Sequence, residues 1–155
     1  MNRKIKFRVW DKYKKQMYPI SSIDYDIFSQ EIRIIAVGHK NGMCTSYNKN
    51  HNSEKCDITA LELMQYTGLH DKNGKELYEG DIVKITEKEK ISKHKVISMK
   101  PIIADIEWSE EYLTYTLITT SVKDAFESLT DYLDEYDIEV IGNIYDNPEL
   151  LGGEE

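Results

Sequence analysis

The sequence predicts a mainly β fold with minor α content, of the α+β class. Three observations support this class. Short runs rich in β-branched and aromatic residues recur between polar turns along most of the chain. Residues 63–85 show the order strand, turn, strand, Gly-Asp bend, strand, which is typical of small bent sheets and partly closed barrels. The hydrophobic period changes to that of a helix near residues 121–133. We therefore expect a twisted antiparallel, barrel-like sheet, a small N-terminal β lobe and one amphipathic helix.

The stretch LMQYTGLHDKNGKELYEGDIV, residues 63–83, is the expected centre of this fold. Its turn permits two hairpin registers. A two-residue Asn73-Gly74 loop sets Asp71 opposite Glu76, which is a like-charge pair. A type I turn with a glycine bulge at Gly74 sets Asp71 opposite Lys75 instead. We favour the bulged register because it pairs opposite charges and matches the apolar residues.

The N-terminal third predicts two hairpins. Residues 5–10 alternate apolar and basic side chains, as in a half-buried strand, and residues 16–18 form its partner, which ends at Pro19. Residues 23–28 and 31–37 form the second hairpin. A polar connection follows over residues 38–56, with a short strand at 43–47. Residues 57–64 favour a helical turn capped by Asp57 that leads into a strand from about Glu62.

The C-terminal half predicts strands at residues 95–99, 102–108, 112–120 and 138–145. The strands at 102–108 and 112–120 are joined by a polar turn at 109–111. Between residues 121 and 133, the apolar positions fall at i, i+3, i+4 and i+7, with Ser121 as the expected N-cap. The apolar stripe comprises Val122, Ala125, Phe126, Leu129, Tyr132 and Leu133. The whole chain, 1–155, is expected to be a single domain with sub-lobes at 1–56 and 57–155.

The segment MQYTGLHDKNGKELYEGDIV resembles the signature of the YopX family of phage and prophage proteins. Two flanking segments, residues 4–11 and 140–150, fit the same family in the expected order. The resemblance implies a β-rich, phage-encoded protein and supplies no catalytic motif. The turn residues of the signature, to which we assign a structural role, are Gly68, Asp71, Asn73, Gly74, Glu79, Gly80, Asp81, Gly142, Asn143 and Pro148.

Charge is distributed unevenly along this chain of net charge −8. Residues 1–104 hold 19 Lys/Arg and 13 acids, a balance of +6, and residues 105–155 hold one Lys and 15 acids, a balance of −14. Either the two parts attract each other or each faces a different partner. No apolar run approaches the roughly 20 residues of a membrane span. We expect a protein of the bacterial host cytoplasm with no membrane partner, in which Cys44 and Cys56 are reduced.

Three kinds of chemistry are weighed. The spacing of Cys44, His51 and Cys56 fits no established zinc site, and the loop from Asp71 fails the calcium pattern, so no metal and no cofactor are expected. Glu76, Glu79, Asp81 and His70 could serve acid–base catalysis in a small hydrolase, as could a Cys/His site, but a solvated turn also explains these charges. A basic hairpin with interleaved aromatics suits single-stranded nucleic acid. Its residues are Lys4, Lys6, Arg8, Trp10, Lys12, Tyr13, Lys14 and Lys15.

The expected function is a non-enzymatic interaction with an unknown protein partner. Nucleic-acid binding and a hydrolase are the alternatives, and tyrosine-rich strand edges are compatible with a homo-oligomer.

Overall fold

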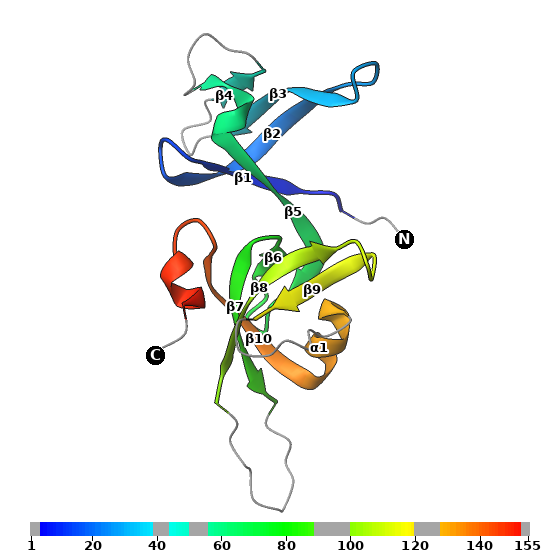
Figure 1. Cartoon of the computed structure of the whole chain (residues 1–155), viewed down its shortest axis with the longest axis vertical. Coiled ribbons are helices and arrows are strands. Elements are labelled where there is room, and N and C mark those ends of the chain that lie inside the picture. Colours follow the sequence, from blue (N-terminus) through cyan, green and yellow to red (C-terminus); the bar gives the residue numbers. More distant parts are fainter. Residues whose placement is uncertain (1–3, 39–43, 50–55, 89–99, 120–127, 153–155) are drawn as a thin grey trace, which may run out of the picture. The chain divides into compact units, whose positions relative to one another are not determined.

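Strands dominate the computed structural model, which describes residues 4–38, 44–49, 56–88, 100–119 and 128–152. The described residues contain ten strands, one α-helix and two 3-10 turns (Figure 1). The strands form two antiparallel sheets, so the predicted mainly β class with one helix is confirmed. The chain divides into two compact units, Met1–Tyr66 and Thr67–Glu155. The boundary falls inside one strand, later in the chain than the sub-lobe boundary expected after residue 56.

The first unit holds five strands, in the order β4-β3-β2-β1-β5, of a six-stranded sheet whose last strand belongs to the second unit. Its strands are β1 (Phe7–Asp11), β2 (Gln16–Asp26), β3 (Glu31–Gly38), β4 (Cys44–Asn48) and the first half of β5 (Leu61–His70). One face of the sheet carries a core of Val9, Tyr18, Ile35, Val37, Tyr47, Ala60 and Leu61. The 3-10 turn η2 (Ile58–Ala60) leads into β5, and the Asp57 side chain accepts a hydrogen bond from Thr59 N, so the predicted capped turn is confirmed.

Proline 19 does not end a strand, contrary to the prediction. β2 runs without a break from Gln16 to Asp26. It pairs with β1 over Gln16–Pro19 and with β3 from Ile20 onward. Pro19 is thus the last residue of β2 that pairs with β1, and pairing with β3 begins at the next residue. Because Pro19 lies between these two pairings, its missing N–H is tolerated inside a long strand.

The second unit contains the rest of β5, its hairpin partner β6 (Glu76–Tyr78), and a four-stranded sheet of order β10-β7-β8-β9. The strands of this sheet are β7 (Asp81–Glu87), β8 (Ile102–Ser109), β9 (Thr114–Ile118) and β10 (Tyr136–Asn143). Its core gathers Leu77, Val83, Ile85, Ala104, Ile106, Tyr115, Leu117 and Ile138 with two helical residues. The strand predicted at residues 95–99 lies outside the described residues.

The helix α1 spans Leu129–Glu135. Its N-cap is Ser128, whose hydroxyl accepts a hydrogen bond from Thr130 N at 3.2 Å, and Ser128 itself is extended. Leu129 and Tyr132 are buried and Leu133 packs against the same core, as the predicted stripe requires. The predicted start at Ser121 lies outside the described residues.

The barrel-like part of the prediction is not confirmed. Among the described residues, no strand pairing closes either sheet on itself. The Asp71–Gly74 turn joins β5 and β6 as a hairpin, whereas the Gly80-Asp81 bend leads from β6 into β7, which is a strand of the other sheet. A Gly-Asp bend between two strands is therefore insufficient evidence of closure.

Candidate functional site

The β5–β6 turn adopts the bulged register. Gly74 N donates to Asp71 O at 3.0 Å, and Asp71 N donates to Lys75 O at 2.8 Å, so Asp71 faces Lys75. Gly74 has φ +81°, the left-handed conformation that glycine adopts without steric cost. The Asp71 side chain accepts from Asn73 N at 2.8 Å and from Lys75 N at 2.9 Å.

The same carboxylate ties this turn to β10. Asp71 is 7% exposed, and its second oxygen accepts from Val140 N at 3.2 Å, while Lys72 N donates to Ile138 O at 2.9 Å. Burial acts to raise the pKa of Asp71, but the hydrogen bonds from Lys75, Val140 and Asn73 outweigh it and hold the pKa below 3.8. A buried carboxylate that accepts three backbone N–H groups holds these segments together, which is a structural role.

The second signature turn, Gly80-Asp81, is likewise built from backbone contacts. Asp81 is 1% exposed and accepts from Tyr78 N at 2.9 Å. Gly80 has φ +74°; its N–H donates to Ile106 O, and its carbonyl accepts from Ile144 N. The turn thus connects β7 to both β8 and the segment that follows β10.

The C-terminal part of the signature forms a third turn. The Asn143 side-chain oxygen accepts from Tyr145 N at 3.1 Å and from Asp146 N at 2.9 Å. A Cβ on Gly142 would lie 2.6 Å from Asn147 Oδ1, so only glycine allows this close approach. Pro148 begins the 3-10 turn η3 (Pro148–Leu151), where its missing N–H needs no partner.

The remaining signature residues also lie in or beside the turns. Gly68 has φ +92° inside β5, next to Thr67, whose hydroxyl donates to Leu77 O at 2.9 Å. Asn73 contributes its backbone N–H to Asp71, and Glu79 is half-buried in the Gly80 turn. The contacts of the signature residues therefore shape the turns of the second unit.

The β1–β2 turn contains a buried charge network. Asp11 is fully buried; it accepts from Tyr13 N at 2.9 Å, from Lys14 N at 2.8 Å and from the Tyr47 hydroxyl. Lys14 Nζ lies 2.5 Å from the Tyr47 hydroxyl and 3.3 Å from Asp11 Oδ2. Burial and the bond to Asp11 raise the pKa of Tyr47 to about 12, so the phenol stays protonated. Each of these polar groups has a hydrogen-bond partner, which indicates that the network stabilises the hairpin.

The predicted nucleic-acid residues differ in their exposure and in their contacts. Trp10 is 3% exposed, so no base can stack on its ring in this conformation. Lys12 donates to Thr59 O and pairs with Glu62 at 2.5 Å, while Arg8 Nε lies 3.3 Å from Met64 Sδ. Lys4, Lys15 and Tyr13 are exposed, and Lys6 lies 5.5 Å from the centre of the Tyr66 ring. Nucleic-acid binding by this hairpin remains a prediction.

The candidate catalytic groups are placed as follows. Glu76 accepts from the Tyr78 hydroxyl at 2.9 Å, Asp81 is held by Tyr78 N, and His70 is exposed at the end of β5. Cys56 is a free, half-buried thiol, while His51 and the side chain of Cys44 lie outside the described residues. Within the described ranges, no three His, Cys, Asp or Glu side chains gather as a metal site would require.

Several exposed apolar side chains gather at each of two hairpin ends that the sequence reasoning did not single out. At the β2–β3 turn, Phe28 is 93% exposed, Ile27 72% and Tyr25 53%. The Asp26 side chain accepts from Phe28 N at 2.9 Å, which shapes the turn. The available signal was a pair of apolar residues enclosed between turn-forming Asp26 and Ser29.

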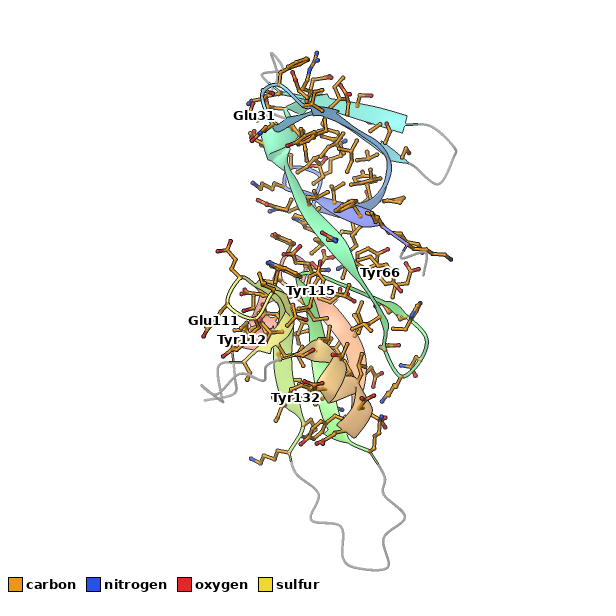
Figure 2. The ribbon with its side chains drawn as sticks, turned by 90° about the vertical axis from the view of Figure 1, so that its right-hand side faces the viewer. Glu31, Tyr66, Glu111, Tyr112, Tyr115 and Tyr132 are labelled. Atoms are coloured by element: carbon orange, nitrogen blue, oxygen red, sulfur yellow. The ribbon has the colours of Figure 1, made fainter. Side chains whose placement is uncertain are left out.

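The β8–β9 turn is the second such end. Leu113 is 75% exposed, and Trp108 and Tyr112 are each 45% exposed. Figure 2 shows Glu111 and Tyr112 at the outer end of the hairpin and Tyr115 deeper among the strands. Trp108 packs edge-on against Tyr115, with 5.2 Å between ring centres. Leu113 has φ +51°, a left-handed conformation that costs a leucine about 1 kcal/mol.

No helix in the described part of the chain is long and apolar enough to cross a membrane. None of the curated proteins matches this sequence. Solved structures do match, and two of them are similar to this chain over nearly their whole length. The chain is 29% identical to protein EF1440 from Enterococcus faecalis, with a TM-score of 0.58 and coverage of 97% of this chain and 99% of that one. It is 22% identical to protein yopX from Bacillus subtilis, with a TM-score of 0.58 and coverage of 94% and 97%, a likeness of fold.

The family model described as YopX protein matches residues 6–152. This match covers the central hairpin, the flanking segment 140–150 and residues 6–11 of the first flanking segment. The chain therefore belongs to the YopX family.

Proposed function

We propose that the protein is a non-enzymatic protein-interaction module, encoded by a phage or prophage and acting in the bacterial cytoplasm. The observation that supports it is the gathering of exposed apolar side chains at the ends of the β2–β3 and β8–β9 hairpins. Neither set contributes to the core of its own unit. The phage origin is supported by the resemblance of the signature to phage and prophage proteins.

The physical argument concerns why these side chains are apolar. A turn is satisfied by polar residues or glycine, so Phe28 and Leu113 are not needed where they lie. At Leu113, backbone strain adds to the cost of exposure, and such strain persists where another requirement outweighs it. Aromatic and large aliphatic side chains on a projecting turn are the anchors that protein interfaces use.

The test is affinity capture of tagged protein from bacteria that carry the phage, with and without nuclease. Wild type is compared with Phe28→Ser and with Leu113→Ser, and Ile5→Ala serves as the control because Ile5 is 74% exposed but lies outside both turns. We expect nuclease-resistant protein partners that are depleted by at least one turn variant and retained by Ile5→Ala. Capture that is unaffected by both turn variants would contradict the proposal.

Single-stranded nucleic acid is the second candidate, favoured by Tyr13, which is 48% exposed between Lys12 and Lys14. It predicts binding of an oligonucleotide that weakens steeply with salt. The informative variants are Lys4→Glu and Lys15→Glu, because Lys12 and Lys14 also stabilise the hairpin internally. Binding that is insensitive to salt and to both variants would reject this candidate.

A further inference from the structure

The end of the β2–β3 hairpin is a two-stranded projection. Among the described residues, β1 pairs with β2 only over Gln16–Pro19 and β4 pairs with β3 only over Ile34–Gly38, with one further backbone bond from Lys49 N to Arg33 O at 3.1 Å. Residues 24–33, here called the finger, therefore extend past the strands β1 and β4 (Figure 1). A two-stranded ribbon gains little stability by itself, so this extension is poorly explained by folding.

The turn of the finger is organised before any partner arrives. The Asp26 carboxylate accepts from Phe28 N at 2.9 Å and from Ser29 N at 3.4 Å. Gln30 completes the turn in the left-handed conformation, with φ +56°. Ile27 and Phe28 are thereby presented to solvent on a fixed backbone, which lowers the conformational entropy lost on binding.

The finger contains more acidic than basic residues. The finger contains Asp24, Asp26 and Glu31 against a single cation, Arg33, a balance of −2. Arg33 lies 3.9 Å from Asp26, and Glu31 pairs with Lys49, while Asp24 is exposed. Figure 2 marks Glu31 at this end of the unit. With Lys49 counted, the charge balance around the finger is −1 and is carried by the exposed Asp24, which disfavours contact with nucleic acid and anionic lipid.

We propose that the finger inserts Ile27 and Phe28 into an apolar socket on a partner protein whose rim carries lysine and arginine. This inference rests on the proposed function and specifies the chemistry of one of its two surfaces. The apolar pair supplies the affinity, and the carboxylates, Asp24 foremost, guide the approach and select a basic rim.

The experiment places the photo-crosslinker p-benzoylphenylalanine at position 28, where it retains the aromatic ring, and irradiates bacteria that carry the phage. The crosslinked peptide of the partner is mapped. We expect apolar residues flanked by Lys or Arg at the attachment point. Adducts to a second copy of this chain, to lipid or to nucleic acid, or the absence of any adduct, would overturn the inference.

The mapped partner is then purified for affinity measurements between 50 and 500 mM salt. Phe28→Ala is expected to weaken binding about 10- to 100-fold. Asp24→Lys is expected to slow association about 10-fold and to flatten its salt dependence. Glu135→Lys changes the net charge equally on an exposed helical position and should have little effect.

The two proposals fail differently. If Phe28→Ala abolishes binding but Asp24→Lys behaves like Glu135→Lys, the finger is an interaction surface and the basic rim is wrong. If Phe28→Ala and Leu113→Ser both leave protein capture unchanged, the interaction function itself is wrong.

Discussion

The β5–β6 turn and the β2–β3 turn form the same local hydrogen bond, but the aspartate of the first turn is buried and the apolar residues of the second turn are exposed. In each, the aspartate that begins the turn accepts a hydrogen bond from the backbone N–H two residues later: Asp71 from Asn73 and Asp26 from Phe28. Asp71 is then buried and reaches a third donor on β10. Asp26 forms no such tertiary bond to the backbone among the described contacts, and its turn exposes Ile27 and Phe28.

The molecule therefore has turns that pack within their unit and stabilise it, and a turn that projects into solvent. Asp11 and Asn143 repeat the device of Asp71, and both belong to packed corners of their units. The apolar and aromatic side chains of the Asn143 turn, Ile144 and Tyr145, are half-buried, whereas Ile27 and Phe28 of the β2–β3 turn are 72% and 93% exposed. This difference in exposure is why we propose a role in recognition for the β2–β3 turn.

Removing the Asp71 carboxylate should have the largest effect on stability. Asp71→Ala leaves the N–H groups of Asn73, Lys75 and Val140 without their acceptor, and we expect a loss of about 3 kcal/mol in the free energy of unfolding. Urea denaturation measures it. Asp26→Ala is the matched control and should shift the midpoint far less. Equal losses in the two variants would show that the turns do not differ as described.

A second prediction tests whether burial alone makes a carboxylate stabilising. Asp105 is 8% exposed, nearly as buried as Asp71, but burial and the nearby Glu107 raise its pKa to about 6. A folded-state pKa above the unfolded value of 3.8 means that Asp105 stabilises the fold when protonated, and that this is lost as pH rises through 6. Asp71, whose folded pKa is lowered, contributes stability above pH 4 that is lost in stronger acid.

Asp105→Asn should therefore stabilise the protein by about 2 kcal/mol at pH 8 and by almost nothing at pH 4. Urea titrations at pH 4, 6 and 8 follow the difference. Glu107→Gln should move the transition toward lower pH, because Glu107 contributes to the shift. An Asp105→Asn effect of the same size at each pH would contradict the assigned pKa.

A third prediction exchanges the left-handed residues of the two turns. The β5–β6 turn has Gly74 at φ +81°, and the β2–β3 turn has Gln30 at φ +56°. No atom lies within 4 Å of a Cβ built on Gly74, so Gly74→Gln should cost only the backbone term, about 1 kcal/mol. Gln30→Gly should gain somewhat less, because glycine also loses more entropy on folding. Thermal unfolding of both variants checks the opposite signs.

The local turns could be predicted from the sequence, but the way in which strands and turns pack against distant segments could not. The bulged register of the Asp71–Gly74 turn was predictable because it pairs Asp71 with Lys75. The neighbouring hairpins were predictable from runs of residues that alternate with period two. By contrast, Pro19 gave the wrong strand end because its tolerance depends on two ladders meeting there. Sheet closure also depends on which strands pair across the chain. Exposure of Phe28 could not be read from sequence, since an apolar residue beside a strand ordinarily indicates core.

The smallest stability effect is expected where the effect on binding is largest. Ile27→Ser with Phe28→Ser removes two side chains that are 72% and 93% exposed, so the free energy of unfolding should change by no more than about 0.5 kcal/mol. Circular dichroism and urea denaturation should match wild type while nuclease-resistant partners are lost. Leu77→Ser, at 0% exposure, provides the contrast, because it should unfold the unit. A marked loss of stability in the finger variant would mean that these side chains pack within the chain, and the β2–β3 turn would then be another structural corner like that of Asp71.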